Sequence, residues 1–181
     1  MKIAVCGSSF AVDKDIAKKA FEIGKQLAKN NILLLTGAGN GYPYEAAKGA
    51  FSIGGKVLGI SPAQNEEEHT KKYLFPKENF TEIEYTGLGI PARNFPLVKE
   101  ADAIILISGQ TGTLNEFTIA FHYKKVIGVL EESGGITSII KKIAEICNKE
   151  NEKENVVYSE NPNELVRLVL EGLKKVTANT T

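Results

Sequence analysis

Short apolar runs alternate with amphipathic stretches along almost the whole chain, and this alternation constrains the fold more than any other feature. The apolar runs lack the polar–apolar alternation that is typical of strands with one face in water. Such strands, separated by helices, are typical of a parallel sheet covered on both faces. The sequence therefore predicts an α/β fold, a Rossmann-like three-layer sandwich with a mostly parallel sheet of about seven strands. The expected strands are residues 3–6, 31–36, 56–60, 82–85, 103–107, 126–130 and 156–158.

The stretches between these runs carry helix signals. Asp13 can cap a helix in which apolar residues recur at helical spacing. Asn161 is followed by a proline at the first helical position, which is a good helix start. We see no internal repeat and no second domain, so we expect one domain over residues 1–177 and a disordered tail over 178–181. The expected helices include residues 44–52, 137–147 and 162–176.

The segment from Pro62 to Phe80 interrupts this alternation. It is long, charged and bracketed by prolines, so we expect a surface loop or a lid. His69 lies within it, and we expect a solvated side chain there, with closure over a ligand as the alternative.

Charge and cysteine content exclude several classes of protein. The formal net charge is zero, which argues against broad nucleic-acid binding, because such binding needs excess positive charge. Cys6 and Cys147 form no metal-binding pattern, and two free thiols fit a reducing compartment. No apolar run approaches the length of a membrane span. We therefore expect a cytoplasmic protein with no membrane partner and no metal, in which Cys6 is a small core residue.

Three turns rich in Gly, Ser and Thr follow predicted strands, at residues 7–9, 37–41 and 108–113. In parallel strands all three open onto the same edge of the sheet, where ligands of open α/β sheets bind. Small residues let backbone amides approach an anion, and helix N-termini add a favourable dipole. The turns therefore predict a phosphate-bearing ligand. The candidate binding residues are Gly7, Ser8, Gly37, Gly39, Gly41, Gly109, Gln110, Thr111, Gly112 and Thr113.

Two familiar phosphate motifs do not fit. A dinucleotide fingerprint beginning at Gly37 would need a third glycine at Tyr42, and the acidic residue expected further along is missing. A P-loop is nearly spelled by AFSIGGKV, but Ala50 replaces its first glycine and Val57 its Ser/Thr. That segment also leads into a strand rather than a helix.

Arg93 and Glu116 flank the third turn in sequence and are the candidate catalytic residues. Each also has a structural explanation. The run Thr113-Leu114-Asn115-Glu116 matches a capping box, in which Thr caps a helix and Glu reaches back to the amide of that Thr. Arg93 could be a solvated helix residue. The functional interpretation instead needs both side chains to point into the ligand site.

At these residues the chain resembles the SLOG superfamily. That group includes the LOG phosphoribohydrolases, often labelled possible lysine decarboxylases, the molybdenum-cofactor carrier proteins and the DNA-processing protein A family. The LOG pattern P-G-G-x-G-T-x-x-E maps onto residues 108–116 and keeps Gly109, Gly112, Thr113 and Glu116. Ser108 replaces its proline and Gln110 its second glycine. The LOG motif M-H-x-R-K appears as residues 90–94, and of it only Arg93 is kept.

The resemblance implies two main functions. One is hydrolysis of a nucleoside 5'-monophosphate to free base and ribose 5-phosphate, with Glu116 acting on the water or on the ribose and Arg93 holding the ligand. The other is non-catalytic binding of a phosphorylated cofactor such as the molybdenum cofactor, which the run Arg93-Asn94 and the helix YEAAKGA favour. No cofactor is required by the first. A single-stranded DNA-binding module is the least favoured, and relatives imply a homodimer or homotetramer.

Overall fold

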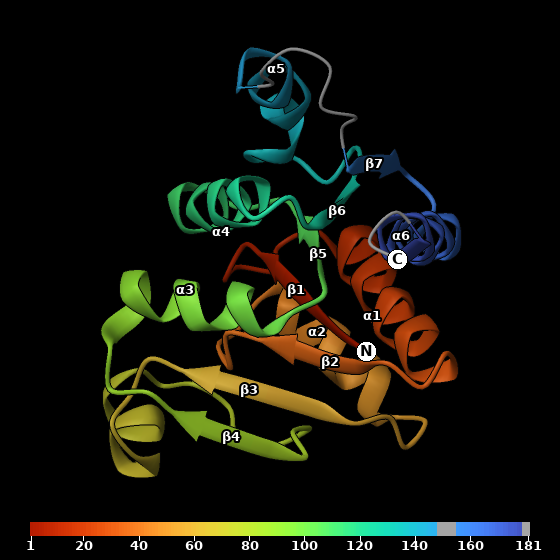
Figure 1. The fold of residues 1–181 in the computed structure, drawn as a ribbon. Coiled ribbons are helices and arrows are strands. Elements are labelled where there is room, and N and C mark those ends of the chain that lie inside the picture. Colours follow the sequence, from red (N-terminus) through yellow and green to blue (C-terminus); the bar gives the residue numbers. More distant parts are fainter. Residues whose placement is uncertain (148–154, 179–181) are drawn as a thin grey trace.

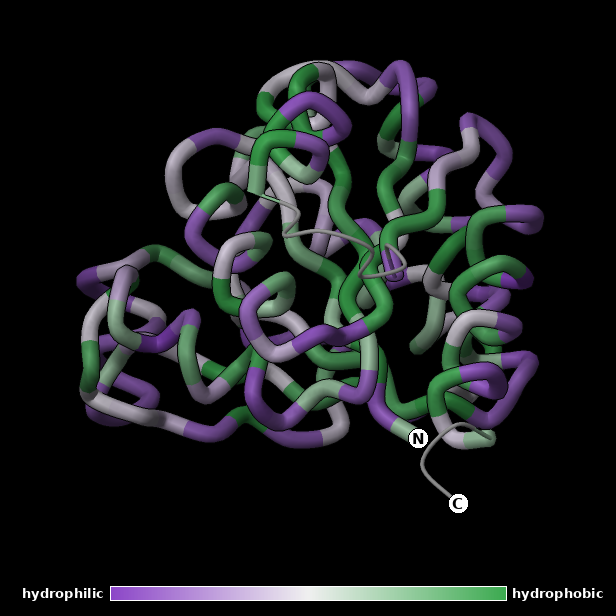
Figure 2. The backbone as a smooth tube through the Cα atoms, turned by 45° about the horizontal axis from the view of Figure 1, so that its top comes forward, coloured by the Kyte–Doolittle hydropathy of each residue, from purple (hydrophilic) through white to green (hydrophobic). Residues whose placement is uncertain are grey.

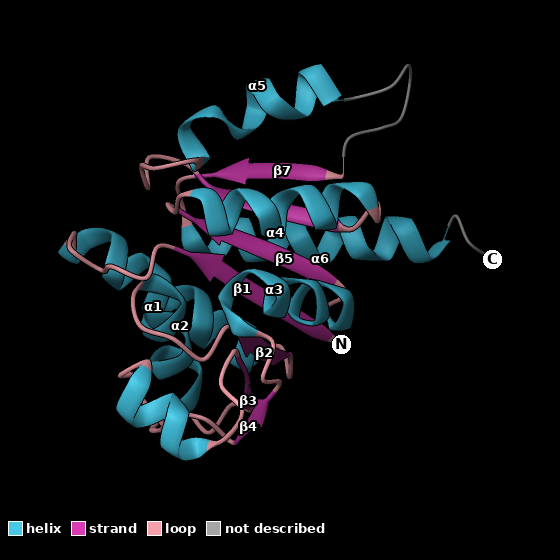
Figure 3. Cartoon of the chain, turned by 90° about the vertical axis from the view of Figure 1, so that its left-hand side faces the viewer, coloured by secondary structure: helices cyan, strands magenta, loops and turns pink. Residues whose placement is uncertain are grey.

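The computed structural model describes residues 1–147 and 155–178. They form a seven-stranded sheet in the order β4-β3-β2-β1-β5-β6-β7, and every neighbouring pair is parallel. In Figure 3 the arrowheads of β1, β5 and β7 accordingly point to the same side of the molecule. The predicted α/β fold with a parallel sheet is confirmed. The strands are β1 (Lys2–Gly7), β2 (Leu33–Thr36), β3 (Val57–Ser61), β4 (Glu82–Tyr85), β5 (Ala103–Ile107), β6 (Val126–Leu130) and β7 (Val156–Ser159).

Helices cover both faces of this sheet. The helix α1 and the C-terminal helix α6 lie on one side of it, while α3 and α4 lie on the other (Figure 1). Asp13 caps α1 as predicted, because its carboxylate accepts the amides of Asp15 and Ile16. The helices are α1 (Lys14–Lys29), α2 (Tyr42–Phe51), α3 (Gly89–Glu100), α4 (Thr111–His122), α5 (Thr137–Cys147) and α6 (Pro162–Ala178).

Two hydrophobic cores form because side chains of each strand alternate between the two faces of the sheet. Ile3 and Val5 of β1 pack toward α1, α2 and α6, whereas Ala4 and Cys6 pack toward α3, α4 and α5. The strands β5 and β6 are buried over their whole length. Figure 2 shows the consequence, with hydrophobic segments at the centre of the fold and hydrophilic ones at its periphery.

The chain order creates one switch point in the sheet. From β1 the chain adds β2, β3 and β4 on one side, and then returns to place β5 on the other side of β1. The loops that follow β1 and β5 therefore diverge, and such a divergence leaves a crevice at the carboxyl ends of the strands. Among the described residues, no helix has the length and apolarity needed to span a membrane.

The segment from Pro62 to Phe80 differs from the expected solvated loop. It contains a short π-helical turn, η1 (Glu68–Lys72), in which His69 is fully buried. The prediction of a solvated His69 was wrong, because its ring is held between the Ser61 hydroxyl and the Pro76 carbonyl. Ala178, assigned to the tail, is the last residue of α6, and residues 179–181 of that tail lie outside the described residues.

Candidate functional site

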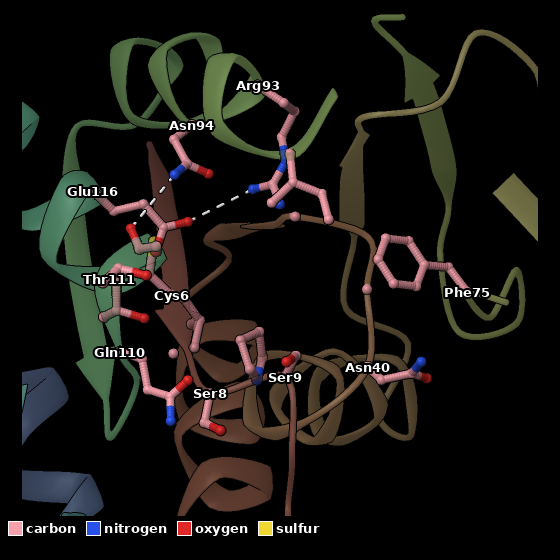
Figure 4. A pocket seen from close by; sticks show the side chains of 18 residues that line it. Cys6, Ser8, Ser9, Asn40, Phe75, Arg93, Asn94, Gln110, Thr111 and Glu116 are labelled. Atoms are coloured by element: carbon pink, nitrogen blue, oxygen red, sulfur yellow. Dashed lines mark hydrogen bonds and ion pairs between the residues drawn. The ribbon is translucent and has the colours of Figure 1, made fainter. Parts of the chain in front are cut away.

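A pocket of about 320 Å³ lies at the carboxyl ends of β1, β2 and β5, at the switch point of the sheet. Its lining comes from all three predicted turns and from α3, α4 and the segment 62–80 (Figure 4). All predicted site residues except Gly41 and Gly109 line it. Those that do are Gly7, Ser8, Gly37, Gly39, Arg93, Gln110, Thr111, Gly112, Thr113 and Glu116.

Arg93 and Glu116 face each other across the upper part of this pocket (Figure 4). Arg93 Nη1 lies 3.6 Å from Glu116 Oε1, and each side chain is only 9% exposed. The Nε and Nη1 groups of Arg93 are buried without a hydrogen-bond partner. Buried polar groups are nearly always hydrogen-bonded, so these guanidinium groups are available to a hydrogen-bond acceptor that enters the pocket.

Glycine at position 37 makes room for this arginine. A Cβ atom at Gly37 would collide with the guanidinium group of Arg93. Gly37 of the second turn therefore leaves space for the side chain of Arg93 on α3, although the two residues are far apart in the sequence. The alternative of a solvated Arg93 does not hold, since the residue is 8% exposed.

The position of Glu116 depends on where α4 begins. The helix starts at Thr111, with Gln110 as its N-cap residue and no side-chain hydrogen bond at the cap. Thr113 is therefore already inside the helix and Glu116 lies in its second turn, which overturns the capping-box interpretation. The carboxylate is buried and points into the pocket rather than back to the helix start (Figure 4).

Burial controls the electrostatics of this pair. Desolvation raises the pKa of Glu116 to about 7, and the nearby Arg93 cation and a hydrogen bond with Cys6 oppose that shift only in part. Desolvation also lowers the pKa of Arg93 from its ordinary value. A carboxyl group with a pKa near neutrality can both accept and donate a proton at physiological pH.

Cys6 and Asn94 also belong to this pocket, although neither was among the predicted site residues. Cys6 is a buried core residue, as expected, but it also lines the pocket beside Glu116. Asn94 Nδ2 donates to Asn115 Oδ1 at 2.9 Å and to the Gly112 carbonyl at 3.4 Å. This residue thereby ties α3 to the start of α4. Its position directly after Arg93 was the one available signal.

The third turn places the N-terminus of α4 against the pocket. The first amides of a helix have no partner within the helix, and they carry the positive end of its dipole. Thr111, Gly112 and Thr113, which supply these amides, line the pocket. A Cβ atom at Gly112 would meet nothing within 4 Å, so the pocket is open at this point. The arrangement can bind an anion.

The neighbouring residues hold the turn in shape. Ser108 has a φ of 55° and its amide donates to Ser133 Oγ at 2.8 Å. A proline could do neither, because its φ is fixed near −65° and it has no N–H. Gly109 has a φ of 96°, and a Cβ there would collide with Thr113. Gly109 is thus a structural residue of the turn rather than a lining residue.

The first two turns are joined at Ser8 and Gly41. The Ser8 amide donates to the Ile107 carbonyl at 3.2 Å, and the Ser8 carbonyl accepts the Tyr42 amide at 3.0 Å. Gly41 has a φ of 84°, and a Cβ there would collide with the Ser8 carbonyl. Gly41 therefore lets two turns approach each other, while Ser8 lines the pocket.

The rest of the lining is largely apolar. It includes Pro43, Ile90 and Phe75, together with Gly39 and the amide side chain of Asn40. Figure 4 shows Phe75 across the pocket from Gln110 and Ser8. Phe75 belongs to the charged segment 62–80, and its participation was not foreseen. Within the described residues, no group of three or more His, Cys, Asp or Glu side chains is arranged to hold a metal ion.

Comparison with known proteins places this geometry in context. A model of the SLOG cluster4 family matches residues 1–166. An uncharacterized protein of Archaeoglobus fulgidus is 33% identical over 132 residues, covering 72% of this chain and 80% of that protein. A probable cytokinin riboside 5'-monophosphate phosphoribohydrolase of rice is 27% identical, with 89% of this chain and 66% of the rice protein covered. The molybdenum cofactor binding protein of Rippkaea orientalis is 25% identical, with a TM-score of 0.77 over 97% of this chain and 96% of that one.

Proposed function

The chain belongs to the SLOG cluster4 family, and from this we propose that it hydrolyses the N-glycosidic bond of a nucleoside 5'-monophosphate. The products are the free base and ribose 5-phosphate. The observation that carries the proposal is the buried Arg93–Glu116 pair, which faces a pocket beside a helix N-terminus and leaves Arg93 nitrogens unpaired. The similarity to the rice phosphoribohydrolase supports it.

The phosphate binds at the start of α4. The amides of Thr111, Gly112 and Thr113 donate to its oxygens, and the helix dipole adds to the attraction. Ser8, which lies beside this turn on the same side of the pocket, contributes its hydroxyl group (Figure 4). The ribose then lies beside Glu116 and Arg93, deeper in the pocket.

Glu116 performs the proton chemistry. A water molecule attacks C1' of the ribose, the C1'–N bond breaks, and its electron pair leaves with the base. Glu116 accepts a proton from the water and stabilises the positive charge that grows on the ribose, as carboxylates do in glycoside hydrolysis. The departing base takes up a proton from solvent, and Glu116 releases the proton it took from the water, so the reaction consumes only water. Arg93 holds a ribose hydroxyl or a phosphate oxygen and keeps part of Glu116 ionised at neutral pH.

A second function is favoured by one specific observation. The Gln110 side chain lines the pocket at the N-cap of α4, where the LOG pattern has a glycine. An added side chain beside the phosphate turn fits a ligand other than a plain nucleotide. The alternative is therefore a binding or carrier protein for a phosphorylated cofactor such as the molybdenum cofactor, in keeping with the similarity to the Rippkaea orientalis protein.

One assay separates the two functions. The purified chain is incubated with a panel of purine and pyrimidine nucleoside 5'-monophosphates, and released ribose 5-phosphate is measured alongside equilibrium binding. Release that is saturable and proportional to protein supports the hydrolase. Binding without release from any nucleotide contradicts hydrolysis and favours the carrier.

We also expect self-association in the cytoplasm, as a homodimer or a homotetramer. Exposed apolar side chains on and around α3 and α4 support an interface there, namely Leu88, Ile90, Phe95 and Tyr123. Light scattering of the purified chain measures the assembly, and a monomer at micromolar concentration contradicts the expectation.

A further inference from the structure

Phe75 is the one aromatic ring among the described residues that line the pocket. It comes from the segment 62–80, outside the parallel strands and their turns. Its ring tip covers Gly39, since a Cβ atom at Gly39 would lie 3.2 Å from Phe75 Cζ. The second turn therefore carries a glycine at this point so that an aromatic ring can lie over the backbone.

His69 fixes the position of this ring from two sides. The Phe75 amide donates to the His69 carbonyl at 3.1 Å, and His69 Nε2 lies 2.9 Å from the Pro76 carbonyl. A carbonyl only accepts, so Nε2 carries the proton, and the Ser61 hydroxyl, 2.8 Å away, donates to Nδ1. The Phe75 amide and the carbonyl of the following residue, Pro76, are thus both bonded to one fully buried histidine.

Other rings support the same side chain. Tyr73 stacks on Phe75 with centroids 5.4 Å apart, and the His69 ring meets it edge-on at 5.6 Å. Aromatic pairs in these geometries stabilise each other beyond their buried area. Phe75 is consequently held in place before any ligand arrives, and the segment 62–80 presents it as a fixed wall.

The order of groups across the pocket matches the order of parts in a nucleotide. Figure 4 shows Gln110, Thr111 and Ser8 on one side, Phe75 on the opposite side, and Glu116 and Arg93 along the edge between them. A ligand with its phosphate at the helix N-terminus and its ribose at the carboxylate therefore extends its base toward Phe75.

From this arrangement, and resting on the proposed function, we propose that Phe75 selects the substrate by stacking on a purine-sized base. Gly39 lies against the ring and the Asn40 amide donates to the neighbouring Leu74 carbonyl at 3.3 Å, while the apolar Pro43 and Ile90 line the same pocket. Such a wall recognises the flat face of a ring rather than its hydrogen-bonding edge, because every base has a π-face and the larger ring buries more of it. The site prefers purine over pyrimidine monophosphates and tolerates substituents on the base. His69 is the positioning residue for this contact.

Binding measurements with three probes test the proposal. The probes are adenosine 5'-monophosphate, cytidine 5'-monophosphate and ribose 5-phosphate, which has no base. Stacking on an aromatic side chain contributes ~1–3 kcal/mol per base, so Phe75→Leu should weaken adenosine monophosphate binding about 10-fold. It should leave ribose 5-phosphate binding unchanged. Phe51→Leu is the matched control, since Phe51 is exposed at the end of α2 and does not line the pocket.

A second variant provides a direct signal. The chain has no tryptophan, so Phe75→Trp introduces a unique fluorophore at this wall. Its emission should be quenched by adenosine monophosphate at the concentrations that saturate binding, less by cytidine monophosphate, and not by ribose 5-phosphate. Equal quenching by all three, or equal loss of all three in Phe75→Leu, overturns the proposal, as does a wild-type chain that binds no nucleotide.

The role of His69 is tested by a double-mutant cycle. If His69 acts only through Phe75, then His69→Ala should weaken adenosine monophosphate binding, and adding it to Phe75→Leu should cause no further loss. Additive losses contradict the positioning role. The stacking role and the hydrolysis can fail independently. Purine-selective binding that depends on Phe75, without release of ribose 5-phosphate, supports the stacking role and refutes the proposed reaction. Hydrolysis with an unchanged KM in Phe75→Leu refutes only the stacking role.

Discussion

The ion pair at the amino edge of the sheet, where the parallel strands begin, differs from the ion pair at the carboxyl edge, where they end. At the amino edge, Lys2 Nζ lies 2.5 Å from Glu100 Oε2, and the Lys2 amide donates to Asp102 at 2.7 Å. The side chains of Lys2 and Glu100 are 42% and 51% exposed. At the carboxyl edge, Arg93 Nη1 lies 3.6 Å from Glu116 Oε1, and each side chain is 9% exposed. Arg93 Nε and Nη1 have no hydrogen-bond partner.

The difference separates a surface contact from a binding site. An exposed pair is well solvated with or without its partner, so its contribution to stability is small. Buried charges lose their hydration, and a pair at 3.6 Å in which two Arg93 nitrogens lack a hydrogen bond does not recover it. The fold therefore tolerates a destabilising arrangement at the carboxyl edge, where a ligand can complete the hydrogen bonds, and avoids one at the amino edge.

The largest expected effect follows from neutralising one carboxylate at each edge. Glu116→Gln should lower kcat by about 10²–10⁴-fold, because the variant cannot accept the proton of the attacking water. Glu100→Gln should leave kcat within about two-fold, since Glu100 is exposed and lies at the opposite edge. Ribose 5-phosphate release at saturating substrate measures both. Near-normal turnover by Glu116→Gln would show that another group performs the proton transfer.

A smaller effect concerns stability and pH. The pKa of Glu116 is about 7 in the folded chain and about 4.5 in the unfolded chain, so between these values the folded state binds more protons. The free energy of unfolding should therefore fall as pH rises from about 4.5 to 7, by about 3 kcal/mol from this group. Exposed carboxylates with lowered pKa values, such as Asp13 and Glu100, have the opposite slope and act below this window.

Urea denaturation at several pH values measures this contribution. The free energy of unfolding of the wild-type chain, minus that of Glu116→Gln, should fall as pH rises from about 4.5 to 7. The same difference taken with Glu100→Gln should not change over this pH range. A flat difference for Glu116→Gln would mean that the carboxyl is solvated in solution, and the contrast between the two edges would then disappear.

The amino-acid sequence predicted the framework of this molecule better than its details. The strands at residues 82–85, 103–107 and 126–130 were predicted to the residue, and the last two are apolar runs bounded by polar residues. All three turns were placed at the correct edge, since parallel strands leave no other choice. Arg93 and Glu116 were identified as candidates, and the structure brings them together.

What the sequence could not provide depends on contacts between distant segments. The capping-box pattern is a local signal that places the N-cap at Thr113, but the N-cap of α4 is Gln110, three residues earlier, which gives no capping signal. His69 is buried only because Ser61 and Pro76 supply its partners. Phe75 reaches the pocket through that same histidine, and nothing in its charged neighbourhood indicates an inward-facing ring.

The smallest effect concerns the space that the carboxyl edge leaves for a ligand. Gly112 lies in the first turn of α4, and a Cβ there would meet nothing within 4 Å. Gly112→Ala should therefore leave the free energy of unfolding unchanged or raise it by up to about 1 kcal/mol, as alanine favours helix. The added methyl group occupies the approach to the α4 amides, so binding of ribose 5-phosphate should weaken about 10-fold. Calorimetric titration and urea denaturation of the same preparation measure the two quantities. Unchanged binding would place the phosphate elsewhere in the pocket, whereas a loss of stability equal to the loss of binding would make Gly112 a structural residue like Gly109.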